Sequence, residues 1–170
     1  YMNEHYAGVF TSPIPRFVPD SIDLISGSGA TALFIIDAAV QLGIPFANVF
    51  SVGNSAQTGL EEALEYLDQS YVHGKSAPVK LIYAETIKNP LKLWKHAASL
   101  YRKGARIAAV KAGSSEAGSR AASSHTGALA SPDTAVAGLF EKAGFIRCNG
   151  RNQLLTVACI LLKGIPKGKN

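Results

Sequence analysis

The sequence is poor in cysteine, in aromatic residues and in charge. Of its 170 residues, two are cysteines, 8% are aromatic and 17% are charged. Cys148 and Cys159 have neither a metal-binding nor a redox spacing, so we expect two reduced thiols rather than a disulfide framework. No grouping of His, Cys, Asp and Glu has the spacing of a protein-bound metal site. Metal-centred and disulfide-rich classes are therefore disfavoured.

A long hydrophobic run is also missing. The most apolar stretch, residues 30–40, is shorter than the roughly 20 residues that cross a bilayer, and there is no signal-peptide pattern. The net charge of +5 comes from scattered lysines and arginines, not from a basic face interleaved with aromatics. We expect a cytoplasmic protein that binds neither membrane nor nucleic acid and prefers anionic small ligands or an acidic partner.

What the sequence does have is a regular alternation of short apolar strands and helices. Residues 1–20, with three prolines, resemble an extended lead-in, and the alternation then fills residues 21–170 as one domain. Strands are predicted at residues 22–26, 47–52, 79–84, 106–110 and 145–148, and helices at residues 29–42, 131–143 and 152–162. Two further helices are predicted from the apolar stripes Leu60/Ala63/Leu64/Leu67 and Leu91/Trp94/Ala98/Tyr101.

This alternation predicts an α/β fold. Five strands separated by helices form a parallel sheet through right-handed crossovers, with helices on both faces. We expect a flavodoxin-like, doubly wound, three-layer α/β/α domain with strand order 2-1-3-4-5. The helix at 29–42 is apolar nearly all round and should be buried on most sides, whereas Glu61, Glu62 and Glu65 should point outward from theirs.

Glycine or a polar residue follows four of the predicted strands. These segments are Ser26–Gly29, then Gly53 with Asn54, then Glu85, then Lys111 to Gly113. Ligands of open parallel sheets bind outside the carboxyl ends of the strands, so all four should meet at one rim.

Ser26–Gly29 joins a strand directly to a helix. The free backbone N–H groups of residues 27–30 could therefore face a phosphate, with the helix dipole behind them. A tight turn that needs glycine is the plainer alternative. The spacing Gly27-x-Gly29-x-x-Ala32 also fits a loose dinucleotide fingerprint, but residues 50–54 hold no acid for the ribose, which disfavours NAD.

The longest loop, residues 111–133, is rich in Gly, Ala and Ser and carries His125. Loops this long inside a domain are usually functional or disordered. A lone histidine there is more often a solvated surface residue, but its context favours a mobile arm with a nucleophilic imidazole. Glu85 could orient that ring; on the residues alone, a solvated Glu at a strand end is an equal alternative. Because residues 113–119 lack the lysine of a P-loop, we reject a P-loop nucleotidase. We assign no function to His5, His73 or His96.

Several segments resemble a known family. Val110–Gly118 (VKAGSSEAG) and Ser123–Ala130 (SSHTGALA) resemble the phosphohistidine loop of NDP-forming acyl-CoA synthetases, the relatives of succinyl-CoA synthetase. Ile25–Ala30 (ISGSGA), Ser51–Asn54 (SVGN) and Tyr83–Ile87 (YAETI) resemble other segments of that family in the same order. The likeness runs from about residue 21 to the C-terminus.

The resemblance implies a reversible reaction, acyl-CoA + ADP + phosphate to carboxylic acid + ATP + CoA. His125 would accept the phosphoryl group from an acyl phosphate, Glu85 would orient and stabilise the phosphohistidine, and Ser26, Gly27, Ser28 and Gly29 would bind the phosphoryl group. Secondary positions are Asn54, Lys111, Gly113, Ser124, Thr126 and Gly127 in the matching segments. CoA and ADP/ATP with Mg would be substrates of the full enzyme, and no tightly bound cofactor is expected here.

The likeness also has departures. The family usually has Gln where Gly27 stands, and Lys-Ala-Asp where residues 55–57 read Ser-Ala-Gln. The family's CoA-binding and ATP-grasp domains are not in this chain; as fused domains or separate subunits they would be its partners, in a homo- or hetero-oligomer. The alternative is a non-catalytic ligand-sensing or regulatory module, like the synthetase-like region of some protein acetyltransferases. His125 and Glu85 together favour the enzyme.

Overall fold

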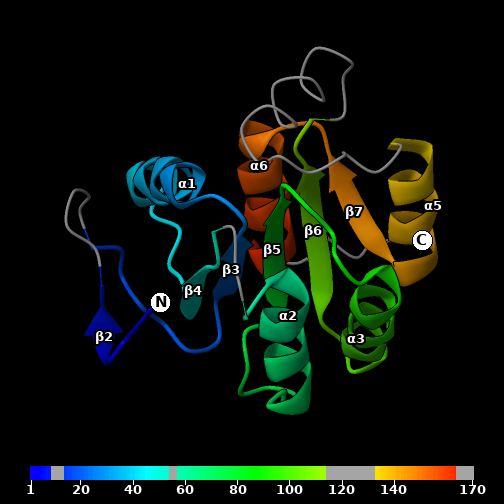
Figure 1. The fold of residues 1–170 in the computed structure, drawn as a ribbon. Helices are drawn as coiled ribbons and strands as arrows, with labels where there is room; N and C mark the ends of the chain where they lie inside the picture. The colour runs from blue at the N-terminus through cyan, green and yellow to red at the C-terminus, as the bar shows by residue number, and fades with distance from the viewer. Residues whose placement is uncertain (9–13, 54–56, 114–132, 164–170) are drawn as a thin grey trace, which may run out of the picture.

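The structure is a computed structural model that describes residues 1–8, 14–53, 57–113 and 133–163 (Figure 1). Its sheet has seven strands in the order β2-β1-β4-β3-β5-β6-β7. The strands are β1 (Met2–Asn3), β2 (Tyr6–Ala7), β3 (Ile22–Ser26), β4 (Asn48–Ser51), β5 (Val79–Ala84), β6 (Arg106–Lys111) and β7 (Phe145–Cys148). From β4 to β7 every pairing is parallel. The predicted order 2-1-3-4-5 is therefore confirmed for the five strands that the sequence indicated.

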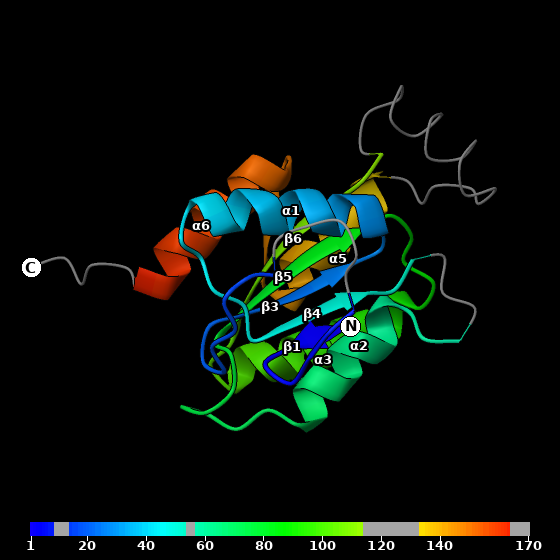
Figure 2. The same ribbon diagram turned by 90° about the vertical axis from the view of Figure 1, so that its left-hand side faces the viewer.

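Two layers of helices cover the sheet, as the alternating pattern predicts. The helices are α1 (Gly29–Gln41), α2 (Leu60–Gln69), α3 (Pro90–Arg102), α5 (Asp133–Ala143) and α6 (Arg151–Lys163). One core cluster joins α2, α3 and α5 to the sheet, and a second joins α1 and α6 to its other face. Figure 2 shows the sheet edge-on between the two layers. Within the described residues, no helix combines the length and apolar composition needed to cross a bilayer.

The N-terminal segment is more than an extended lead-in. Strands β1 and β2 form an antiparallel hairpin, and β1 pairs with the edge strand β4 through Met2 and Val49. Met2 is buried in the α1/α6 core cluster, so covering apolar surface at the sheet edge accounts for the pairing. The expectation that residues 1–20 lie outside the folded unit is therefore wrong for residues 2–7.

Two helices are buried differently from the expectation: α3 buries another face, and α1 is buried on fewer sides. On α3 the buried residues are Leu93, His96, Ala97 and Leu100, while Leu91, Trp94 and Tyr101 are exposed. On α1, Ile35 and Ile36 are buried, but Phe34 stays 57% exposed beneath the guanidinium of Arg151. The expectation that α1 is buried on most sides does not hold in this chain, because only one of its faces meets the sheet and α6.

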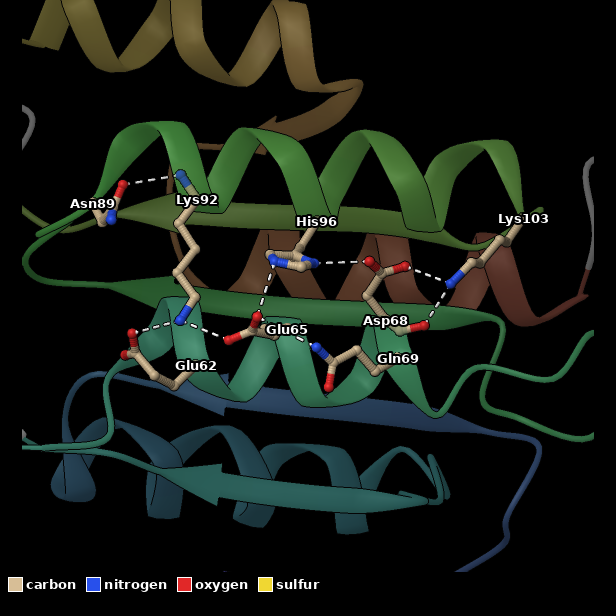
Figure 3. Close-up of polar contacts among 8 residues, drawn as sticks. All are labelled: Glu62, Glu65, Asp68, Gln69, Asn89, Lys92, His96 and Lys103. Carbon is tan, nitrogen blue, oxygen red and sulfur yellow. Dashed lines mark hydrogen bonds and ion pairs between the residues drawn. The ribbon is translucent and has the colours of Figure 1, made fainter.

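An ion-pair network connects α2 to α3 (Figure 3). Lys92 lies 3.0 Å from Glu62 and 2.6 Å from Glu65. The buried His96 lies 2.8 Å from Asp68 through Nδ1 and 3.5 Å from Glu65 through Nε2, and Lys103 donates to Asp68 at 2.8 Å. Glu62 and Glu65 therefore face α3 rather than open solvent, which corrects the outward orientation predicted for them.

A second ion pair lies under α2 at the amino ends of the strands. Lys80 on β5 pairs with Asp23 on β3, and both are buried. Asn48 on β4 donates to the same carboxylate at 2.7 Å, and Lys80 also donates to the carbonyl of Ala77 at 2.8 Å. Each group has partners, as a buried charge requires. This pair lies at the end of the sheet opposite the predicted rim.

Candidate active site

The carboxyl ends of β3, β5 and β6 meet, as the fold predicts. The Gly27 N–H donates to the carbonyl of Tyr83 at 2.8 Å, which carries the β3–β5 pairing one residue past the strand end. The Lys111 Nζ, at the end of β6, donates to the carbonyl of Glu85 at 3.0 Å. These contacts bring Ser26–Gly29, Glu85 and Lys111 together at one rim of the sheet.

Close backbone contact explains glycine at position 27. A Cβ built there would lie 3.2 Å from the Glu85 nitrogen and 3.4 Å from the Tyr83 carbonyl oxygen, tighter than most real Cβ contacts. Gly27 therefore lets the start of the Glu85 loop lie directly against the turn that leads into α1. At the next strand end, a Cβ on Gly29 would lie 3.6 Å from the Ser51 hydroxyl, so β4 also reaches this rim.

The start of α1 is where the sequence predicts an anion site. Ser28 is the N-cap, and its hydroxyl accepts from the Thr31 N–H at 3.3 Å. Among the four N–H groups proposed, Gly27 donates to Tyr83 and Ser28 donates to the Ser26 hydroxyl at 3.3 Å. Gly29 and Ala30 are exposed, and no hydrogen bond between described residues uses their N–H groups. An anion could therefore contact these two amides, with the helix dipole behind them.

Glu85 follows β5 and is half-buried at the rim. Among the described residues its carboxylate accepts no hydrogen bond, whereas its carbonyl is bound by Lys111. A carboxylate held in this way can accept a hydrogen bond from a ligand or from an imidazole without first breaking one.

Lys111 is a buried cation at the same rim, 5% exposed. Its Nζ donates to the carbonyls of Glu85 and Ala112 at 3.0 and 2.6 Å. Burial lowers the pKa of the Lys111 ammonium, and the negative charges of Asp133 and Glu85 act in the opposite direction. Lys111 thus binds a carbonyl just after the end of β5 and another just after the end of β6.

The two ends of the long loop are described and its centre is not. The loop leaves the sheet at Gly113, whose positive φ of 70° suits glycine. At its other end Asp133 begins α5 and pairs with Arg147 on β7. His125, Ser124, Thr126 and Gly127, and also Asn54, lie outside the described residues, so their roles stay predictions. Among the described residues, no three His, Cys, Asp or Glu side chains gather as a metal site.

One residue that binds the loop after β5 was missed by sequence reasoning. Glu61, expected to point outward from α2, is 2% exposed, and its carboxylate accepts from the N–H groups of Lys88 and Asn89. These amides end the loop that Glu85 begins. The apolar stripe gave no signal for this contact, because it depends on a loop 27 residues away along the chain.

Comparison with known proteins identifies relatives over most of the chain. Residues 19–161 match the family described as the succinyl-CoA ligase like flavodoxin domain. "Acetate--CoA ligase [ADP-forming] I" of Archaeoglobus fulgidus is 35% identical over 150 residues, which are 87% of this chain and 21% of the relative. The alpha subunit of "Acetate--CoA ligase [ADP-forming] II" of Pyrococcus furiosus is 33% identical over 148 residues, 87% of this chain and 31% of the relative.

A solved structure agrees. A dinucleotide forming acetyl-coenzyme A synthetase 1 of Ca. Korarchaeum cryptofilum, in complex with phosphate and ADP, superposes with a TM-score of 0.79 at 26% identity, covering 89% of this chain and 32% of that one. The chain spans about a fifth to a third of the length of these relatives. The strand order, the rim and the matched residues lead to one conclusion: the chain belongs to the family of succinyl-CoA ligase-like flavodoxin domains.

Proposed function

We propose that this chain is the phosphoryl-carrying domain of an ADP-forming acyl-CoA ligase in the cytoplasm. The supporting observation is the rim, where an exposed helix start, a carboxylate without a hydrogen bond among the described residues and the entrance of the long loop lie together. The relatives are named acetate–CoA ligases, which favours a small carboxylic acid as the acyl group.

The chemistry divides into two phosphoryl transfers. In the synthesis of ATP, the His125 imidazole attacks the phosphorus of an acyl phosphate; an N–P bond forms, the P–O bond breaks, and the carboxylate leaves. An oxygen of the ADP β-phosphate then attacks the same phosphorus, and the N–P bond breaks as ATP forms. Charge on the transferring group is what a helix N-terminus stabilises, and both steps run in reverse from ATP.

Glu85 would act on the histidine rather than on the phosphorus. A carboxylate that accepts a hydrogen bond from one ring nitrogen leaves the other nitrogen free as the nucleophile, and it stabilises the positive ring that forms on phosphorylation. The described structure leaves this carboxylate without a competing hydrogen-bond partner, which supports the role. Lys111 and Gly113 would define where the loop that carries His125 departs from the sheet.

An apolar cavity beside the helix start suits the organic part of the substrate. Its volume is about 410 Å³, and its wall includes Gly29, Ala30, Leu33 and Val49. An acyl phosphate whose phosphoryl group contacts the Gly29 and Ala30 amides could extend its apolar part in this direction. In this role the chain would need partners that bind CoA and the nucleotide with Mg, as fused domains or as separate subunits.

Phosphohistidine formation tests the proposal. The full-length protein is incubated with γ-labelled ATP and magnesium and quenched in alkali, with His125→Ala treated in parallel. We expect base-stable, acid-labile label on the wild type and none on the variant. If ATP binds but no label appears on the wild type, the proposal is wrong and a ligand-sensing module of the same fold is the better description.

A further inference from the structure

Glu61 is a buried carboxylate in the first turn of α2. Its side chain is 2% exposed, and the same oxygen, Oε1, accepts from the Lys88 N–H at 2.7 Å and from the Asn89 N–H at 2.9 Å. A buried carboxylate is costly unless hydrogen bonds compensate it, and two amide donors provide that compensation. The two amides therefore require a hydrogen-bond acceptor oxygen at this position.

The two amides lie where the loop after β5 turns into α3. The loop comprises residues 85–89, and Asn89 caps α3 by accepting from the Lys92 N–H at 3.0 Å. Glu61 thus fixes the far end of the short segment whose first residue is Glu85. Ile87, within that segment, is buried in the α2/α3/α5 core cluster, which limits movement further.

The near end of the same segment is fixed from the other side. Lys111 Nζ donates to the Glu85 carbonyl at 3.0 Å, and the Gly27 N–H donates to the Tyr83 carbonyl at 2.8 Å. The loop is therefore held through its backbone by a carboxylate from α2 and an ammonium from β6, while an amide from the β3–α1 turn holds Tyr83 on β5, just before the loop. All of these contacts are to main-chain groups, and none uses the Glu85 carboxylate.

We infer that Glu61, together with Lys111, is a positioning residue for the Glu85 carboxylate. The inference rests on the proposed function, in which Glu85 orients the phosphorylated histidine. Because the Glu85 side chain makes no hydrogen bond of its own among the described residues, its position follows from the backbone that carries it. A displacement of about 1 Å at a reacting group can lower a rate by about a hundredfold, so a rigid loop has direct value for catalysis.

Hydrogen exchange tests the structural half of this inference. In the full-length protein, Glu61→Ala should speed exchange of the Lys88 and Asn89 amides by about tenfold or more, because these groups open when their acceptor is lost. Glu61→Gln keeps an acceptor oxygen and should restore slow exchange. Glu65→Ala is the matched control, since Glu65 lies on the same helix and contacts Lys92 and His96 but not the loop. Unchanged exchange in Glu61→Ala would overturn the inference.

A double-mutant cycle tests the functional half. Glu61→Ala should slow phosphorylation of the protein by about tenfold with little change in the KM for ATP, and Glu61→Gln should recover most of that rate. In a Glu85→Gln background, Glu61→Ala should have almost no further effect, because a residue that acts only through Glu85 loses its influence with it. If the two substitutions multiply their effects, Glu61 acts on stability or elsewhere, and the inference fails.

Two features keep the outcomes separable. If Glu61→Ala does not fold, Lys111→Met releases the loop from the other side and is expected to show the same dependence on Glu85. If the wild type is not phosphorylated at all while Glu61→Ala still exchanges faster, the proposed function fails and the contact between Glu61 and the loop stands. If exchange stays slow in Glu61→Ala while the wild type is phosphorylated normally, the positioning role of Glu61 fails and the proposed function stands.

Discussion

Two sets of charged side chains in this domain differ in the groups they bind. Between α2 and α3, the charges pair with one another, and Asp68 receives hydrogen bonds from both His96 and Lys103. At the rim, Glu61 and Lys111 bind main-chain amides and carbonyls instead. Glu85 takes part in these contacts through its carbonyl, and its carboxylate has no hydrogen bond within the described residues.

This difference separates structural from functional charge. A polar network whose members satisfy each other stabilises the fold but has no capacity left for a ligand. A carboxylate and a helix start that lack partners remain available, provided that something else holds their backbone in place. The buried charges of Glu61 and Lys111 therefore hold the backbone that carries Glu85, whereas the charges between α2 and α3 hold these two helices together.

The largest effect is expected at Glu85. Glu85→Gln should slow phosphorylation of the protein by about a hundredfold, because a neutral amide stabilises a cationic ring much less than a carboxylate does. The melting temperature should stay unchanged, since the substitution breaks no hydrogen bond among the described residues. Rapid-quench labelling and calorimetry on the same sample measure both, and a clear loss of stability with normal labelling would reverse the assignment.

Asp68→Asn tests the structural side. We expect the free energy of unfolding to fall by about 1–3 kcal/mol, because the charged hydrogen bonds from Lys103 and His96 are weakened in a buried position. Labelling of the folded protein should be unchanged. Urea denaturation gives the stability, and slow labelling at full stability would show that the network also serves the site.

Acid should remove the stability that the Asp68 carboxylate adds. Burial raises the pKa of the Asp68 carboxyl, but hydrogen bonds from Lys103, His96 and Ser99 outweigh it and leave the pKa below its usual value. The stability that this carboxylate adds is fully present above the pKa of the unfolded chain and is lost as the pH falls through the lower folded pKa. The urea midpoints of wild type and Asp68→Asn should therefore differ by a constant amount from pH 7 down to the pKa of the unfolded carboxyl and approach one another below it. Curves that stay parallel down to pH 3 would contradict this.

The smallest expected effect belongs to Lys92→Met. The Lys92 ammonium contacts Glu62 and Glu65 at the more accessible end of the network, where solvent screening leaves little net stabilisation. Its melting temperature should lie close to that of the wild type, and its labelling rate should not change. A loss as large as that of Asp68→Asn would mean that burial does not rank the members of this network.

The parts of the fold that depend on local pattern were predictable. Apolar strands followed by glycine or a polar residue predicted the five parallel strands, their order and the meeting of Gly27, Glu85 and Lys111 at one rim. These features follow from short apolar runs that alternate with helical stretches, from the strand order of a doubly wound fold, and from the rule that ligands bind at the carboxyl ends of parallel strands. The hairpin at residues 2–7 was missed because two-residue strands are too short to show a period.

The errors concern contacts between distant segments. On α3, Leu91/Trp94/Ala98/Tyr101 is as regular a helical stripe as Leu93/Ala97/Leu100, and only packing on the sheet selects the second. Likewise Glu61 read as solvated because the amides that bury it belong to another loop. His125 and Asn54 lie outside the described residues, so for them the sequence interpretation remains a prediction.

A chase of the labelled protein tests the phosphoryl-carrying role most directly. Full-length protein labelled from γ-labelled ATP is freed of nucleotide, mixed with ADP and magnesium, and sampled over time, while a second portion is digested to locate the label. We predict that the label lies on His125 and leaves the protein as ATP. Label on another residue, or label that ADP cannot remove, would contradict a phosphoryl-carrying role for this domain.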